Sequence, residues 1–268
     1  MDAGIPFPEI DPVALAIGPF AIRWYALAYL AGFLGGWAYA NRLTALSPKS
    51  RPNREDIDNL LPWVVLGVIL GGRLGYVLFY NLPYYLQNPL HIPFIWEGGM
   101  SFHGGLLGVI VVCVAFARHY KFSALALGDI VATVVPIGLF FGRLANFING
   151  ELFGRITTVP WAINFPQGGG LPRHPSQLYE AFLEGIVLFI LLYWLSRKQS
   201  VRRAHGLLFG VFIIGYSLSR FLVEFVREPD PQIGLILDYF TLGQLLCIPM
   251  MIAGGVLISY ARKHAKEN

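Results

Sequence analysis

Residues 60–80 form a nearly continuous apolar run, LLPWVVLGVILGGRLGYVLFY, in which Arg73 is the one charged residue. A helix of about 20 apolar residues crosses a hydrocarbon core of roughly 30 Å. The run also lacks the two-residue alternation that is typical of a barrel strand. It therefore predicts a helix that spans a membrane.

Six other stretches of the same character surround this run. The seven candidate spans cover residues 20–41, 60–80, 100–117, 125–142, 179–196, 206–226 and 241–261. The third and fourth are the weakest, because a glycine or a proline interrupts each. Composition agrees, since 55% of the residues are AVILMFWYC and 13% are charged, about half the usual charged share. We predict an all-α, polytopic membrane bundle of about seven helices, with residues 1–268 as a single membrane domain.

The lysines and arginines orient the predicted bundle, because cytoplasmic loops carry the positive excess. Thirteen of the 20 lie in the connections after the first, third and fifth spans and in the C-terminal tail, and four lie in connections on the opposite side. This predicts a periplasmic N-terminus and a cytoplasmic C-terminus. The net charge of +4 arises from short separate clusters and not from one basic stripe, which argues against nucleic acid as a partner.

The longest connection, residues 143–178, is rich in proline and glycine and is predicted to be an irregular loop on the periplasmic side. Loops of this length in a compact chain are usually functional or disordered. Its glycine run, residues 168–170, lacks the preceding strand and following helix of a phosphate-binding loop. We therefore interpret that run as a linker.

The predicted spans contain charged residues, and an arginine at the centre of a spanning helix costs about 2.5–3.5 kcal/mol. Arg220 and Glu224 are four residues apart and can form an ion pair on one helix. We expect the acids to neutralise only some of the arginines, so an anionic ligand would supply the remaining charge. A phospholipid phosphate fits, because a guanidinium binds phosphate oxygens in pairs. The embedded charged residues are Arg23, Arg73, Arg143, Arg220, Asp129, Glu180, Glu184 and Glu224.

His103 is the candidate general base, because a neutral imidazole accepts a proton from a thiol or an alcohol. Glycines follow it directly and allow a backbone or a ligand to approach closely. A histidine that packs between helices is the alternative. His174 is a rival on the same side, although its neighbouring prolines favour a structural turn.

Other kinds of site are not indicated. Cys113 and Cys247 stand alone in apolar runs and are interpreted as packing residues. The sequence has no Gly-x-Ser-x-Gly, no His-Glu-x-x-His and no aspartate-rich cation motif. We expect no metal and no cofactor, and we expect the nucleophile to come from a substrate.

Residues 142–154, GRLANFINGELFG, resemble the signature of the bacterial prolipoprotein diacylglyceryl transferase family. Five further blocks agree with the family in order, at residues 23–25, 71–76, 101–105, 173–180 and 220–225. Ala26 and Ala145 stand where many relatives have glycine, and each adds only a methyl group.

The resemblance implies a multi-pass enzyme of the bacterial inner membrane. Such an enzyme moves the diacylglyceryl group of phosphatidylglycerol to the lipobox cysteine of a preprolipoprotein signal peptide and releases glycerol 1-phosphate. Its partners would be phosphatidylglycerol, these signal peptides and membrane lipids. The family's proposed base maps to His103, and its phosphatidylglycerol-binding arginines map to Arg143 and Arg220. Six other residues match functionally important positions of the family and are candidate substrate-binding residues: Tyr25, Asn146, Glu151, Gly154, Tyr216 and Glu224. The charge argument adds Arg73 as a further candidate.

We hypothesise that His103 acts as a base or orients the thiol while Arg143 and Arg220 hold the phosphate. Preorganised donors of this kind are worth about 3–4 kcal/mol each. The alternative is a membrane transporter for anions or lipids, in which the same arginines line a path. An internal repeat would favour transport, and none is evident by eye.

Overall fold

A computed structural model describes residues 4–8, 10–18, 20–47, 50–229 and 240–265. The chain divides into two compact units. The first unit consists of Met1–Ala40 and Asp129–Asn268, and the second consists of Asn41–Gly128.

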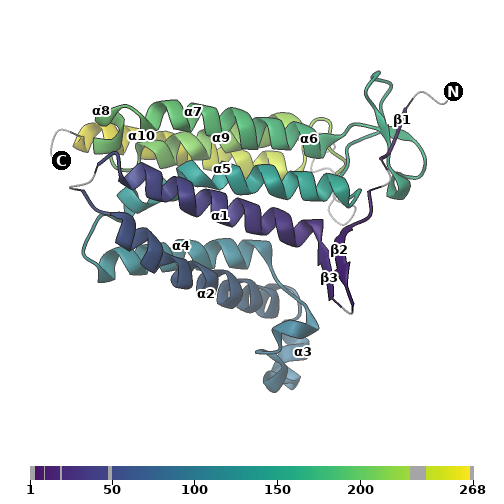
Figure 1. Cartoon of the computed structure of the whole chain (residues 1–268), viewed down its shortest axis with the longest axis horizontal. Coiled ribbons are helices and arrows are strands. Elements are labelled where there is room, and N and C mark those ends of the chain that lie inside the picture. Colours follow the sequence, from purple (N-terminus) through teal and green to yellow (C-terminus); the bar gives the residue numbers. More distant parts are fainter. Residues whose placement is uncertain (1–3, 9, 19, 48–49, 230–239, 266–268) are drawn as a thin grey trace. The chain divides into compact units, whose positions relative to one another are not determined.

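Long helices make up most of the first unit (Figure 1). One of them is continuous from Ser176 to Ser196 and consists of α6, a π-helical segment η4, and α7. Two helices, α1 and α5, also extend into the second unit at one end. The helices are α1 (Trp24–Thr44), α5 (Ala124–Ile148), α6 (Ser176–Glu180), η4 (Ala181–Val187), α7 (Leu188–Ser196), α8 (Gln199–Arg203), α9 (Leu207–Val223) and α10 (Leu242–His264).

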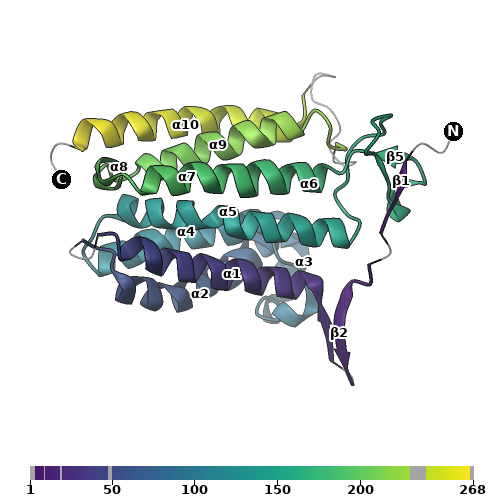
Figure 2. The ribbon, with the colours of Figure 1, turned by 45° about the horizontal axis from the view of Figure 1, so that its top comes forward.

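Glycines set the closest helix contacts of this unit. Helices α9 and α10 lie side by side (Figure 2) and meet at Gly210 and Gly254, where a Cβ on either would lie 2.9 Å from the carbonyl oxygen of the other. Helices α1 and α5 meet at Gly32, whose Cβ would lie 3.0 Å from the Cα of Gly138. Small residues at such crossings are typical of helices that pack in lipid.

The second unit is built on a pair of helices, α2 (Arg54–Phe79) and α4 (Phe102–His119), which pack along each other (Figure 1). Their interface again consists of glycines spaced four apart, so that a Cβ on Gly71 would lie 2.8 Å from the Cα of Gly108. Between these helices come the short segments α3 (Leu82–Gln87), η1 (Pro89–His91) and η2 (Ile95–Glu97).

Short strands accompany the helices and were not predicted. A three-stranded sheet has the order β1 (Ile5–Pro6), β4 (Ile163–Asn164) and β5 (Pro172–Arg173), with β1 parallel to β4 and β4 antiparallel to β5. A hairpin pairs β2 (Val13–Ile17) with β3 (Phe20–Arg23). The first predicted span therefore begins with a strand, and its helix starts at Trp24.

A helix lies at each of the seven predicted spans. Among the residues that the structure describes, five helices are long and apolar enough to cross a membrane: α2, α4, α5, Ser176–Ser196 and α10. Helix α9 is apolar but shorter, with 17 residues, and α1 is not among the five. A helical, multi-pass membrane protein is thus confirmed, while the count of seven spans stays a prediction.

The long connection is shorter than predicted. Helix α5 continues to Ile148, so Arg143 lies inside a helix and the connection runs over residues 149–175. Residues 143–148 contain neither glycine nor proline and extend the helix without interruption. The chain leaves the helix at Gly150, whose φ of +65° is a conformation that glycine adopts readily. The one helical segment within this connection is η3 (Pro166–Gly168).

Candidate functional site

Three arginines and three glutamates form an ion-pair network within the first unit, and we call it the ionic cluster. Arg143 on α5 lies 3.2 Å from Glu180 (Nη1 to Oε2) and 3.4 Å from Glu184 (Nη2 to Oε2). Arg220 on α9 pairs with Glu180 and with Glu224. The members are Arg143, Arg220, Arg227, Glu180, Glu184 and Glu224.

Glu180 is the centre of the cluster. Its carboxylate contacts Arg143 and Arg220, and its Oε1 lies 3.5 Å from Nη1 of Arg227. The side chains of Glu180 and Glu184 are fully buried, and those of Arg143 and Arg220 are each 15% exposed. Charges so deeply placed are tolerated when they are paired, which explains how the bundle accommodates these arginines.

The ionic cluster bears on one expectation. The embedded acids are expected to neutralise only some of the arginines, and Arg143 and Arg220 are indeed paired with carboxylates of the chain. Arg73 instead binds backbone carbonyl oxygens, and Arg23 has no carboxylate partner among the described residues. The predicted pair between Arg220 and Glu224 is confirmed.

The π-helical segment η4 helps to place the two glutamates. It follows Glu180 and contains Glu184, and both carboxylates reach Arg143. Gly185 lets η4 approach α5 closely, since a Cβ there would lie 2.7 Å from the Cβ of Phe140. Single π turns inside helices are frequent at functional sites.

Some polar atoms of this region are buried without a hydrogen-bond partner among the described residues. They are Nε of Arg143, Oε1 of Gln177, Oε1 of Glu184 and Oγ of Ser217. Such atoms are costly in an apolar interior unless a ligand or water satisfies them. The cluster therefore retains donors and acceptors for a polar ligand although its charges balance.

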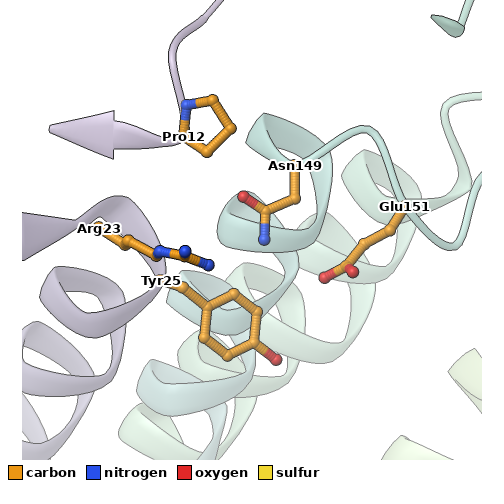
Figure 3. A pocket seen from close by; sticks show the side chains of 5 residues that line it. All are labelled: Pro12, Arg23, Tyr25, Asn149 and Glu151. Atoms are coloured by element: carbon orange, nitrogen blue, oxygen red, sulfur yellow. The ribbon is translucent and has the colours of Figure 1, made fainter. Parts of the chain in front are cut away.

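A pocket of about 480 Å³ lies nearby in the first unit, and we call it the Tyr25 pocket. Figure 3 shows the side chains of Arg23, Tyr25, Asn149 and Glu151 turned toward one space, with Pro12 at its edge. Arg23 is the last residue of β3, Tyr25 is in the first turn of α1, and the other two follow the end of α5.

Two residues that are neighbours of cluster members along α5 and α6 contact Glu151 of the pocket. Asn146 lies one turn after Arg143 on α5, and its Nδ2 donates to Oε1 of Glu151 over 2.7 Å. Gln177, which precedes Glu180 by three residues, donates from Nε2 to the carbonyl oxygen of Glu151 over 2.6 Å. The two groups are thus neighbouring parts of one polar region.

The sequence model of the prolipoprotein diacylglyceryl transferase family matches residues 12–260. The chain belongs to this family. It is 59% identical to a relative from Rhodospirillum rubrum over 263 residues, which are 97% of this chain and 95% of the relative. It is 57% identical over 261 residues to one from Azospirillum brasilense, with 97% of each chain covered. A third, from Paramagnetospirillum magneticum, is 54% identical over 268 residues, with 99% of each covered. All three are named phosphatidylglycerol–prolipoprotein diacylglyceryl transferase.

Most positions that match the transferase family's motif fall in these two groups. Tyr25, Asn146 and Glu151 belong to the pocket or contact it. Arg143, Arg220 and Glu224 belong to the ionic cluster. Tyr216 lies one helical turn before Arg220 on α9.

Gly154, another position of the family motif, lies where three backbone segments converge. Its N–H donates to the carbonyl oxygen of His174 over 2.8 Å, and it forms a β-bridge with Arg227. A Cβ at Gly154 would lie 2.7 Å from the Cβ of His174. Only glycine fits there, and the contact ties the segment that carries Arg227 to the long connection.

His174, the rival base, has a structural setting. Its Nδ1 lies 3.2 Å from the hydroxyl oxygen of Tyr179, which also accepts from Nε1 of Trp161 over 2.6 Å. Partial burial lowers the pKa of His174 below its ordinary value. The ring is therefore neutral at pH 7, and the backbone carbonyl oxygen of His174 accepts from the N–H groups of Gly154 and Ser176.

His103, the transferase family's proposed base, lies in the second unit. It is exposed in the first turn of α4, directly after the helix cap, where Ser101 Oγ accepts from the N–H of Gly104 over 3.2 Å. The following glycine serves helix packing, because a Cβ on Gly104 would lie 2.8 Å from the Cα of Gly75 on α2.

Arg73, also in the second unit, is buried and bound to the backbone. Its Nε donates to the carbonyl oxygen of Ile92 over 2.6 Å and its Nη2 to that of His91 over 2.7 Å. Its Nη1 donates to the carbonyl oxygens of Gly98 and Gly99. These contacts hold the segment before α4, so substrate binding by Arg73 stays a prediction while a local structural role is visible.

Three members of the ionic cluster were not predicted as site residues: Glu180, Glu184 and Arg227. For the two glutamates a signal was present in the spacing. Glu180 and Glu184 are four residues apart, a spacing that repeats a helical face. Arg227 lies after the end of α9, so helical spacing gives no signal for it.

Proposed function

We propose that this chain transfers the diacylglyceryl group of phosphatidylglycerol to a cysteine thiol of a prolipoprotein, the first step of lipoprotein maturation. Membership of the transferase family over residues 12–260 is the observation that carries this conclusion. The buried ionic cluster supports it, since polar groups inside an apolar bundle indicate a functional site.

The proposed placement is the bacterial inner membrane, with seven spans, a periplasmic N-terminus and a cytoplasmic C-terminus. The distribution of lysine and arginine supports this orientation. The connection of residues 149–175 then lies on the periplasmic side. We treat residues 1–268 as one membrane domain, because α1 and α5 each run without a break through both units.

The proposed acceptor is the lipobox cysteine of a preprolipoprotein signal peptide. A free thiol has a pKa near 8.5 and needs a base to become the nucleophilic thiolate. His103 takes this proton. The thiolate sulfur then attacks the carbon of the diacylglyceryl group that is bonded to the phosphate oxygen. A C–S bond forms to this carbon as its C–O bond to the phosphate breaks. Glycerol 1-phosphate leaves with the electron pair of that bond.

The negative charge that grows on the leaving phosphate is the part of the reaction that arginines stabilise. Arg143 and Arg220 are the proposed phosphate ligands. Both are already paired with glutamates, but a guanidinium has five N–H donors and the Nε of Arg143 is unused. This spare donor is proposed to bind the phosphate while the carboxylates stay in place.

The test is transfer by the purified protein. Phosphatidylglycerol and a lipobox peptide are incubated with it, and mass spectrometry of the peptide is expected to show the gain of one diacylglyceryl group. A peptide with serine in place of the cysteine controls for the site. Flux of phosphatidylglycerol across sealed vesicles with an unmodified peptide would instead indicate a transporter.

A further inference from the structure

Arg23 differs from the other arginines of the polar region. Arg143, Arg220 and Arg227 are paired with carboxylates. The side chain of Arg23 is exposed and makes no hydrogen bond or ion pair with any residue that the structure describes. Its charge is therefore available to a ligand.

The hairpin and α1 fix Arg23 at the wall of the Tyr25 pocket. Arg23 pairs with Val13 across the hairpin, and α1 starts at the next residue. The N–H of Trp24 donates to the carbonyl oxygen of Pro12 over 3.1 Å, which closes the edge of the pocket beside the guanidinium. The cation is thus held by secondary structure, and Figure 3 shows it directed into the cavity.

The remaining walls supply acceptors for hydroxyl groups. One carboxylate oxygen of Glu151 accepts from Asn146, while the other has no partner among the described residues. Asn149 presents an amide and Tyr25 a phenol to the same cavity. One cation facing a set of neutral and anionic acceptors suits a ligand that combines a phosphate with free hydroxyls.

We propose that the Tyr25 pocket binds a glycerophosphate group, with Arg23 as its phosphate ligand and Glu151 and Asn149 as acceptors for its hydroxyls. The inference rests on the proposed function, which supplies two sources of this group: the head group of phosphatidylglycerol and the released glycerol 1-phosphate. The pocket receives the group at the exposed side of the polar region, while Arg143 and Arg220 act on the phosphate during transfer.

An apolar track beside the pocket fits a lipid as the source. Tyr29 and Phe33 follow Tyr25 on the same face of α1 at intervals of four residues, and they are 64% and 41% exposed. A head group in the pocket then leaves its acyl chains against this face.

The test compares Arg23→Gln with Arg54→Gln in the full-length protein. Arg54 is the matched control, because its side chain is 74% exposed at the start of α2 and the same charge is removed. In the first arm, KM for phosphatidylglycerol in mixed micelles is expected to rise ~10-fold in Arg23→Gln, with a smaller change in kcat, as the loss of a charge-assisted hydrogen bond predicts. Arg23→Lys is expected to recover part of the loss.

In the second arm, glycerol 1-phosphate is titrated directly into the protein without peptide, and its Kd is expected to rise ~10-fold in Arg23→Gln. A change in the first arm alone assigns the pocket to the lipid head group, and a change in the second alone assigns it to the product. Equal values for both variants in both arms overturn the proposal. Absence of transfer by the wild-type protein would instead count against the proposed function. The second arm would still test the pocket in that case, because binding of glycerol 1-phosphate needs no turnover.

Discussion

Nη1 of Arg143 lies 3.2 Å from Oε2 of Glu180, and this pair joins α5 to α6 at the centre of the ionic cluster. The same carboxylate contacts Arg220 and Arg227, so it balances cations from three segments of the chain. A cluster of this kind both stabilises the bundle and fixes the guanidinium groups that are proposed to meet the phosphate. The two roles can be separated by substitution.

Removing the charge of Glu180 tests the structural role. Glu180→Gln leaves three buried arginines facing fewer carboxylates, and breaking a buried pair in this way costs about 3–5 kcal/mol. We expect a clear fall in the unfolding midpoint of the detergent-solubilised protein. Glu228→Gln is the control, because Glu228 is 44% exposed in its pair with Arg173 and such pairs contribute about 0–1 kcal/mol. Equal midpoints for the two variants would contradict this role of Glu180.

Changing the shape of a cation while keeping its charge tests the phosphate clamp. Arg143→Lys loses the planar fork of donors, including the unused Nε, and is expected to lower kcat by ~100-fold. Arg197→Lys, at the exposed end of α7, is the matched control and should retain wild-type transfer. Undiminished phosphatidylglycerol binding and turnover by Arg143→Lys would exclude the clamp.

The parts of the fold that were predicted depend on local patterns. Apolar runs located the long helices, and the spacing of Arg220 and Glu224 predicted their ion pair, because both features involve neighbours along one helix. Residues 20–23 were assigned to a span although they form β3. A short apolar run alone does not distinguish a strand from the start of a helix.

The parts of the site that were missed depend on tertiary contacts. No local pattern reveals that Glu180 serves three arginines from α5, α9 and the segment after α9. Gly104 is a similar case. Its position beside His103 suggested access for a ligand, whereas in the structure α2 fills the space that a side chain would occupy.

Replacing His103 tests the proposed base. His103→Gln keeps a polar side chain of similar reach at an exposed helix position, so the fold should persist. Loss of general base catalysis is expected to lower turnover by about 10²–10⁴-fold. His119→Gln, at the other end of the same helix, controls for the loss of an exposed histidine. Wild-type turnover by purified His103→Gln would remove the base role.

The glycine interface between α2 and α4 makes a separate prediction about stability. Gly104→Ala places a methyl group 2.8 Å from the Cα of Gly75, where backbone cannot yield without moving a helix. Overpacking of this kind costs about 1–3 kcal/mol, and the unfolding midpoint should fall. Gly255→Ala on α10 meets no atom within 4 Å and should be neutral or stabilising. A Gly104→Ala protein as stable as Gly255→Ala would show that the helices separate at little cost.

His174 predicts how stability depends on pH. Burial lowers the pKa of its ring below the ordinary 6.5, so the unfolded chain binds this proton more readily than the folded protein does. The contribution is therefore fully present above pH 6.5 and is lost as the pH falls toward the folded pKa. Between about pH 7 and pH 5, the unfolding midpoint of the wild-type protein should fall more steeply than that of His174→Gln. Parallel pH profiles would mean that the ring accepts a proton without cost, contrary to the effect of its burial.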